Sequence, residues 1–141
     1  MSDKLFTIDD VRLLEFGQHG DARGQLVVIE GGQSIPFEIK RVFYIYGADA
    51  ETVRGQHANR RSGFVMINVA GSCCIRVKDA WGAEREYLLD QPYSGLFVPP
   101  MIWKDMYGFS KDAVLLVLSS EHYDAGEYIR DYHDLLSASQ N

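Results

Sequence analysis

Cysteine, histidine and long apolar runs are all scarce in this 141-residue sequence. The two cysteines, Cys73 and Cys74, are adjacent, and neighbouring strand residues point to opposite faces, so they cannot easily form a disulfide with each other or build a zinc site. No apolar stretch approaches the roughly 20 residues needed to cross a bilayer, and the start, Met1 to Lys4, lacks the pattern of a signal peptide. We therefore expect a cytoplasmic protein that does not enter a membrane.

The sequence also has no excess of basic residues. Its 14 Lys and Arg stand against 20 Asp and Glu, which gives a net charge of −6. This balance argues against a general nucleic-acid surface, although it leaves room for a local basic pocket. With 46% hydrophobic and 24% charged residues, the composition is typical of a soluble globular protein. We expect a single domain over residues 1–141, with no nucleic-acid partner.

Short β-like segments make up most of the sequence. Apolar or alternating runs occur at 26–30, 39–46, 64–69, 73–78, 85–89, 95–98 and 113–118, and Ala80 to Ala83 reads as a hairpin tip. Their spacing predicts an antiparallel sandwich or barrel. The segment 125–136 instead predicts a short amphipathic helix or helical turn, because its apolar residues recur at helical spacing: Tyr128, Ile129, Tyr132, Leu135 and Leu136. We expect a frayed tail from Ser137 to Asn141.

Among the four histidines, His57 is the one best placed for chemistry. It lies between two apolar strand-like runs, whereas the other three lie in polar or tail-like contexts. An imidazole with a reference pKa of about 6.5 can act as base and acid near neutral pH. Arg54, Arg60 and Asn59 beside it are suited to hold an anionic or carbonyl-bearing ligand. The segment therefore predicts a small proton-transfer site, with an ordinary hydrogen-bonded turn histidine as the alternative.

A metal-binding cupin site does not match this segment. Small barrels often hold a ligand at the mouth or inside, and such cupins normally supply His-x-His, a nearby Glu and a later His. Here His57-Ala58-Asn59 is followed by residues 60–63, which contain no carboxylate, and the turn at 99–104 has no histidine. One imidazole and one amide do not make a three- or four-ligand site, so we expect no bound metal.

Several motifs follow one another along most of the chain, from about Leu14 to Leu136. They include Asp21-Ala22-Arg23-Gly24, Arg54-Gly55-x-His57-Ala58, Asn68-x-x-Gly71-Ser72, Trp103-Lys104-Asp105-Met106 and Tyr128-Ile129-Arg130-x-Tyr132. In this order they resemble the dTDP-sugar 3,4-ketoisomerases (WxcM-like cupins). The resemblance implies an all-β, cupin-type antiparallel barrel or jelly roll with a short C-terminal helix. It also implies that no cofactor is needed, and it usually implies a homodimer.

The resemblance further implies the reaction. These enzymes act on dTDP-4-keto-6-deoxyglucose and move the keto group from C4 to C3 through an enediol, which supplies precursors of deoxysugars. Removing the C3 proton beside a ketone needs a positioned base, and C4 must then receive a proton. General acid–base assistance of this kind contributes about 10²–10⁴-fold. Neither step needs a redox cofactor or a metal.

The resemblance marks three candidate catalytic residues. His57 corresponds to the principal histidine of the family, which transfers the C–H proton. Asn59 stands where many members have a second histidine, and an amide can hydrogen-bond a substrate oxygen but cannot titrate. Phe43 stands where some members have a tyrosine. Tyr44 is the nearest hydroxyl, although as the neighbouring strand residue it faces the other way.

The candidate substrate-binding residues are arginines suited to grip a diphosphate, together with residues at the sugar end of the pocket. They are Arg41, Arg54, Arg60, Arg23, Lys104 and Trp103. In the family, the positions of Arg23 and Lys104 influence the C4 configuration of the product. Arg23 is the residue of galacto-forming members, whereas Lys104 is neither of the common choices, arginine and histidine. Trp103 fits stacking on a base or sugar as well as it fits a core position.

Two hypotheses of different classes stay open. The first is the isomerase, and the second is a module that binds the dTDP-sugar without turnover, which the departures at Phe43 and Asn59 suggest. An epimerase would need a second titrating group across the pocket, which the sequence does not locate. We expect Tyr123, Asp124 and Tyr128 to pack on or cap the C-terminal helix rather than to contact ligand.

Overall fold

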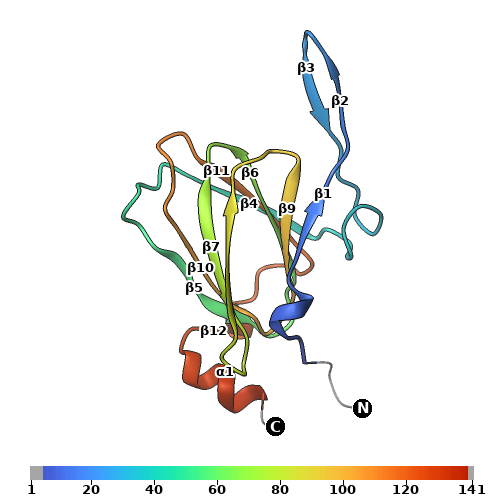
Figure 1. The fold of residues 1–141 in the computed structure, drawn as a ribbon. Helices are drawn as coiled ribbons and strands as arrows, with labels where there is room; N and C mark the ends of the chain where they lie inside the picture. The colour runs from blue at the N-terminus through green and yellow to red at the C-terminus, as the bar shows by residue number, and fades with distance from the viewer. Residues whose placement is uncertain (1–4, 140–141) are drawn as a thin grey trace.

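Two five-stranded antiparallel sheets face each other in the computed structural model, which describes residues 5–139 (Figure 1). The first sheet has the order β1 (Arg12–Glu15), β9 (Ser94–Val98), β6 (Phe64–Ala70), β11 (Val114–Ser119), β4 (Arg41–Tyr46). The second has the order β12 (Tyr128–Ile129), β5 (Arg54–Asn59), β10 (Trp103–Tyr107), β7 (Cys73–Lys78), β8 (Glu84–Leu89). This arrangement confirms the predicted cupin-type antiparallel fold.

The core lies between the two sheets and follows from the alternation of side chains along the strands. In β7, Cys73, Ile75 and Val77 are buried, and the residues between them face outward. In β6, all five residues from Phe64 to Asn68 are buried. Cys73 and Cys74 are free thiols, as their adjacency predicts. The turn at 80–83 joins β7 to β8, where the Asp79 carboxylate accepts hydrogen bonds from the backbone of Trp81 and Ala83.

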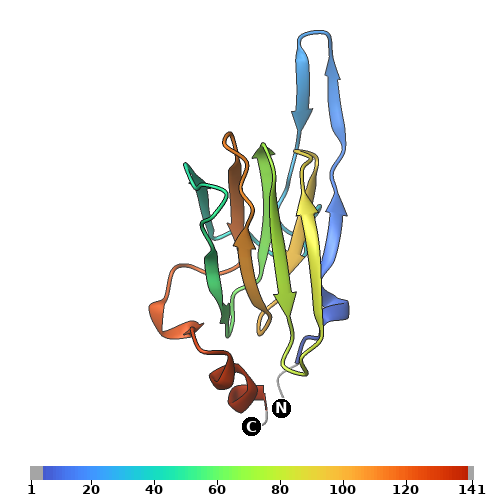
Figure 2. The same cartoon turned by 60° about the vertical axis from the view of Figure 1, so that its left-hand side comes forward.

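One hairpin projects away from the body of the two sheets (Figures 1 and 2). It consists of β2 (Gln18–Asp21) and β3 (Gly24–Val27), and all four residues of β2 are exposed. The apolar run at 26–30 was predicted as a strand, but only its first two residues belong to one. At the other end of β1, a short 3-10 helix, η1 (Ile8–Asp10), contacts the body through a hydrogen bond from the Ile8 amide to Asp79.

The C-terminal segment differs from the single helix predicted over 125–136. It forms the 3-10 helix η2 (Ala125–Glu127), then strand β12, then helix α1 (Tyr132–Ser139). Tyr128 and Ile129 pair with Asn59 and Ala58 of β5, so long-range pairing overrides the local helical spacing. The helix reaches Ser139, which corrects the predicted fraying from Ser137, and residues 140 and 141 lie outside the described residues. Within residues 5–139, no helix is long and apolar enough to cross a membrane.

Candidate functional site

A cavity of about 330 Å³ opens between the sheets. Its walls come from β4, β5, β6 and β10 and from the segment that carries Tyr123, Tyr128 and Arg130. Phe43, Phe64 and Met66 provide apolar surface. The charged or titratable lining groups are Tyr44, Arg54, His57, Lys104, Tyr123, Tyr128 and Arg130. A concave, mostly apolar pocket with a few convergent polar groups is typical of a small-molecule site.

A β-bulge directs His57 into the cavity. Across the β5–β10 ladder, Lys104 is opposite His57 and Asp105 is opposite Gly55, so Gln56 is an extra residue. Gly55 and Gln56 both have positive φ, of 83° and 56°. A Cβ at Gly55 would lie 2.9 Å from the Lys104 carbonyl oxygen, so this bulge requires glycine.

The ring of His57 is fixed in one tautomer. Nδ1 lies 2.9 Å from the carbonyl oxygen of Gly55, and because a carbonyl only accepts, Nδ1 carries the proton. Nε2 therefore keeps its lone pair in the neutral ring, which also packs against Tyr128 with the ring centroids 4.9 Å apart. Burial, followed by the positive charge of Lys104, lowers the pKa of His57 from 6.5 to about 4. At neutral pH, His57 is thus an uncharged base.

Lys104 is a buried ammonium beside that base. Its side chain is only 2% exposed, and its Nζ donates a hydrogen bond to Asn59 Oδ1 at 3.1 Å. Nζ also lies 4.7 Å from the centroid of the Phe64 ring. No carboxylate within residues 5–139 comes within ion-pair distance of it. Burial lowers the pKa of Lys104 from 10.5 to about 7, against the opposing effect of the Glu127 charge.

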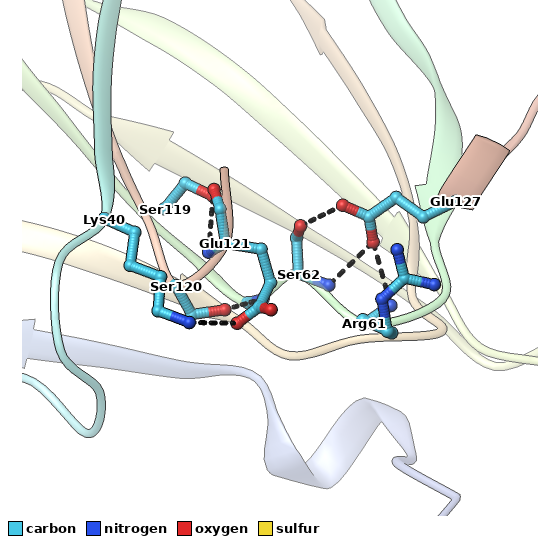
Figure 3. A network of polar contacts seen from close by, with 8 residues as sticks. Lys40, Arg61, Ser62, Ser119, Ser120, Glu121 and Glu127 are labelled. Carbon is cyan, nitrogen blue, oxygen red and sulfur yellow. Dashed lines mark hydrogen bonds and ion pairs between the residues drawn. The ribbon is translucent and has the colours of Figure 1, made fainter. Parts of the chain in front are cut away.

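Glu127 supplies a negative charge that acts on Lys104, and its carboxylate is held by Arg61 and Ser62 (Figure 3). It is fully buried, and its carboxylate accepts hydrogen bonds from the backbone amides of Arg61 and Ser62, both at 2.9 Å, and from the Ser62 hydroxyl. Burial acts to raise the pKa of Glu127, but the hydrogen bonds outweigh it and the pKa is lowered. Sequence reasoning did not single out Glu127. The neighbouring Glu121 instead forms a partly exposed ion pair with Lys40 at 3.8 Å, outside the cavity lining.

Six of the predicted residues lie at or next to the cavity, one of them at its rim. His57, Arg54 and Lys104 line it, and Asn59 is buried beside Lys104. Arg41 stacks on two lining rings, with its guanidinium carbon 5.1 Å from the Phe43 centroid and 5.5 Å from that of Tyr123. Its Nε and Nη2 are buried and have no hydrogen-bond partner among residues 5–139, an arrangement suited to an incoming anion.

Tyr44 also lines the cavity, but at its exposed rim. It is 62% exposed, and its ring stacks on Tyr46 with centroids 6.2 Å apart. Phe43 and Ile45, on either side, point inward, so the alternation of β4 turns the Tyr44 hydroxyl away from His57.

The structure does not bring Arg23, Arg60 or Trp103 to the cavity of this chain. Arg23 lies in the projecting hairpin, where its 91%-exposed side chain pairs with Asp21 at 2.8 Å. Arg60 is exposed beyond the end of β5 and is not a lining residue. Trp103 faces the outer side of the second sheet because its neighbour Lys104 faces inward, and it packs edge-to-face on Tyr132 at 5.8 Å.

Among the charged and aromatic hydroxyl-bearing lining residues, sequence reasoning missed Arg130, Tyr128 and Tyr123. Tyr128 and Tyr123 were expected to pack on or cap the C-terminal helix. Instead, the pairing of β12 with β5 brings the ring of Tyr128 against that of His57. The guanidinium of Arg130 lies 4.9 Å from the Tyr128 ring centroid. Asp124 does cap a helical turn, η2, and also pairs with Arg61 at 2.6 Å. The only sequence signal for Arg130 was its place in the motif at 128–132.

The donor set of this site does not suit a transition metal. Within residues 5–139, no group of three or more His, Cys, Asp and Glu side chains is placed to hold a metal ion. His57 faces a lysine and arginines, which would repel a cation. The groups present are instead suited to bind an anion and to move protons.

The sequence is similar to sugar-nucleotide isomerases. The family model described as WxcM-like, C-terminal (FdtA) matches residues 9–140. The TDP-4-oxo-6-deoxy-alpha-D-glucose-3,4-oxoisomerase of Aneurinibacillus thermoaerophilus is 41% identical over 121 residues, which cover 86% of each chain.

Solved structures agree with the sequence match. QdtA, a sugar 3,4-ketoisomerase from Thermoanaerobacterium thermosaccharolyticum in complex with TDP, superposes with a TM-score of 0.91 at 38% identity, covering 95% of this chain and 97% of that chain. WlaRA, a TDP-fucose-3,4-ketoisomerase from Campylobacter jejuni, gives a TM-score of 0.86 at 40% identity, covering 92% and 95%.

Proposed function

The chain belongs to the WxcM-like, C-terminal (FdtA) family, and from that membership we propose that it isomerises dTDP-4-keto-6-deoxyglucose to the 3-keto sugar, with His57 as the base. It is a TDP-sugar 3,4-ketoisomerase by its similarity to enzymes of that activity. The observation that supports the role of His57 is its geometry: an uncharged imidazole whose Nδ1 is held by Gly55 and whose Nε2 is free in the cavity.

The first chemical step is removal of the C3 proton. His57 Nε2 accepts this proton, and the electron pair moves into a C3–C4 double bond as O4 gains charge. In the second step, the imidazolium returns the proton to C4 as C3 becomes the ketone, and the proton of the O3 hydroxyl is transferred to O4. The cavity assists by placing cationic groups, Lys104 and the nearby arginines, around the developing oxyanion.

Arginines provide the binding site for the diphosphate. Arg54 and Arg130 line the cavity, and Arg41 has two buried donors directed at no protein acceptor within residues 5–139. Bidentate hydrogen bonds from guanidinium groups match phosphate geometry. The rings of Tyr123 and Tyr128 border the same space and provide apolar surface for the sugar or base.

A binding module without turnover is the alternative that the departures at positions 43 and 59 suggest. The free and uncharged Nε2 of His57 favours the isomerase, because a site that only binds has no need of a buried base. An NMR assay of dTDP-4-keto-6-deoxyglucose separates the two. The isomerase converts it to a 3-keto sugar, whereas a binding module gives tight dTDP binding in a titration and no conversion.

We also propose a homodimer, as one cytoplasmic domain over residues 1–141. Exposed apolar side chains support the dimer: Leu26 on the projecting hairpin is 59% exposed, and Val42 and Tyr46 on the outer face of edge strand β4 are 53% and 73% exposed. Burying such side chains against a second copy would cover both the edge and the hairpin. A partner's hairpin would also carry Arg23 toward a site that it does not reach within one chain. Light scattering after size exclusion tests the dimer, and a monomer would overturn it.

A further inference from the structure

Two of the positions at which this chain departs from the family pattern, Asn59 and Lys104, contact each other. Lys104 Nζ donates to Asn59 Oδ1 at 3.1 Å, within the wall of the cavity. We propose that Lys104 is the second proton-transferring residue of the isomerisation, relaying a proton between the O4 and O3 atoms of the substrate while His57 moves the C–H proton. This inference rests on the proposed function and supplies the titrating group that sequence reasoning did not locate.

The backbone register places the two bases side by side. Lys104 and His57 are partners across the β5–β10 ladder, and directly opposite residues of an antiparallel pair project to the same face. Both line the cavity. An ammonium has three donor hydrogens, and the bond to Asn59 is the only one that Nζ forms with residues 5–139. Two hydrogens are therefore free for a ligand.

The electrostatics favour one positive charge shared by the pair. Burial lowers the pKa of Lys104 to about 7, and burial together with the Lys104 charge lowers the pKa of His57 to about 4. Two cations this close in a buried site disfavour each other, so protonation of one favours deprotonation of the other. Further charged or titratable groups border the pair from β5, β4, η2 and the C-terminal segment: Arg54, Arg41, Glu127, Tyr123, Tyr128 and Arg130.

The proposed relay balances every proton. His57 takes the C3 proton, Lys104 gives one to O4, and the bound species is a neutral enediol. His57 then returns its proton to C4, and Lys104 takes the proton of the O3 hydroxyl as C3 becomes the ketone. Both residues end as they began, and the pair carries a single positive charge at each stage. No electron leaves or enters the substrate, so no redox partner is needed.

Asn59 acts as the positioning residue of this pair. Its amide oxygen orients the Lys104 ammonium without adding a negative charge, so the lysine stays easy to deprotonate. A carboxylate in the same place would stabilise the ammonium and raise its pKa by about one to three units.

The test compares Lys104→Arg, Lys104→Met and the wild type. Arginine keeps the charge but does not titrate near neutral pH, and methionine keeps the length without charge. We expect kcat to fall on the order of 10²-fold in both variants. We also expect kcat/KM of the wild type to decline above about pH 7, the pKa of Lys104, and this alkaline decline to be absent in Lys104→Arg. Circular dichroism and dTDP titration serve as controls for folding and binding.

A third variant raises the pKa of Lys104 rather than replacing the lysine. In Asn59→Asp, the alkaline decline of kcat/KM shifts to higher pH by at least one unit, which a purely structural role of Lys104 would not produce. The relay is overturned if Lys104→Arg keeps the wild-type kcat, or if its alkaline decline persists. An inactive wild type would instead contradict the proposed function itself, so the two failures are distinguishable.

Discussion

The two faces of strand β10 are formed by alternate residues of one segment. Polar side chains on the outer face have charged or hydroxyl partners, whereas the lysine on the inner face has no charged partner among residues 5–139. On the outer face, Asp105 pairs with Arg76 at 3.3 Å, and Tyr107 donates to Glu86. The neighbouring Lys78 pairs with Glu84 at 3.8 Å and lies over the Tyr132 ring. On the inner face, the only hydrogen-bond acceptor that Lys104 Nζ contacts within residues 5–139 is the amide oxygen of Asn59.

This difference indicates where the function lies. Polar groups that face solvent are paired by the protein, although such surface pairs add little stability. Among residues 5–139, the cavity side of the two sheets holds a buried ammonium with no ion-paired carboxylate, an imidazole nitrogen with no protein partner, and two donors of Arg41 that form no hydrogen bond. Leaving such groups buried and incompletely paired destabilises the fold, so their presence points to a ligand that completes them.

The largest expected effect comes from removing the inner-face base. We expect His57→Asn to lower kcat by about 10³–10⁴-fold, because asparagine has no group that can accept the C3 proton. Product formation followed by NMR measures the change. Affinity for dTDP, measured by calorimetry, should stay within about threefold. A variant with more than a tenth of the wild-type kcat would remove His57 from the mechanism.

The free energy of unfolding of Lys104→Met tests whether the buried lysine on the inner face destabilises the fold. Because folding lowers the pKa of Lys104 from 10.5 to about 7, the unfolded chain binds this proton more tightly, and the fold loses stability as the pH drops from about 10 to 7. We expect Lys104→Met to be more stable than the wild type by roughly 1–4 kcal/mol at pH 7, with the difference shrinking toward pH 10.

Urea unfolding at both pH values checks this prediction. The matched control is Lys78→Met on the outer face, which should change the free energy of unfolding by less than about 0.5 kcal/mol. A Lys104→Met variant that is less stable than the wild type at pH 7 would show that the buried ammonium supports the fold.

A smaller effect is expected from removing one of the arginines proposed to bind the diphosphate. Losing one charge-assisted hydrogen-bonding group costs about 1.5–3 kcal/mol, so Arg54→Met should weaken dTDP binding by about 10- to 100-fold, with a smaller change in kcat. Arg60→Met is the control, because Arg60 is exposed and lies outside the cavity lining. Equal losses in the two variants would contradict the placement of the diphosphate beside Arg54.

The smallest effect is expected on the outer face of β10. Trp103→Phe should leave KM and dTDP affinity within about twofold, because Trp103 packs on Tyr132 and does not line the cavity. Steady-state kinetics provide the check. A tenfold rise in KM would mean that the outer face takes part in substrate binding, for example across a dimer interface.

The sequence predicted most strands and a histidine that the structure places in the cavity lining, for a clear physical reason. Apolar runs and turn residues report local burial, and the segment at 54–60 lies between two such runs. Alternation of neighbouring strand residues also limits what a pattern can place together: of Trp103 and Lys104, only one could face the cavity, and similarly for Phe43 and Tyr44.

The parts that were missed depend on contacts far apart in the chain. Arg130 and Tyr128 reach the cavity because β12 pairs with β5, some 70 residues earlier, and helical spacing gave no hint of that pairing. The contact between Asn59 and Lys104 is also non-local, because the two residues are 45 positions apart in the sequence. Local periodicity carries no information on such partners.

The most direct test of the isomerase is incubation of the wild-type protein with dTDP-4-keto-6-deoxyglucose in deuterium oxide. We predict that a 3-keto sugar nucleotide forms and that solvent deuterium appears at C3 or C4 as the reaction approaches equilibrium. Tight binding of dTDP by the same sample, with neither product nor deuterium in the sugar, would contradict the account and leave a binding module.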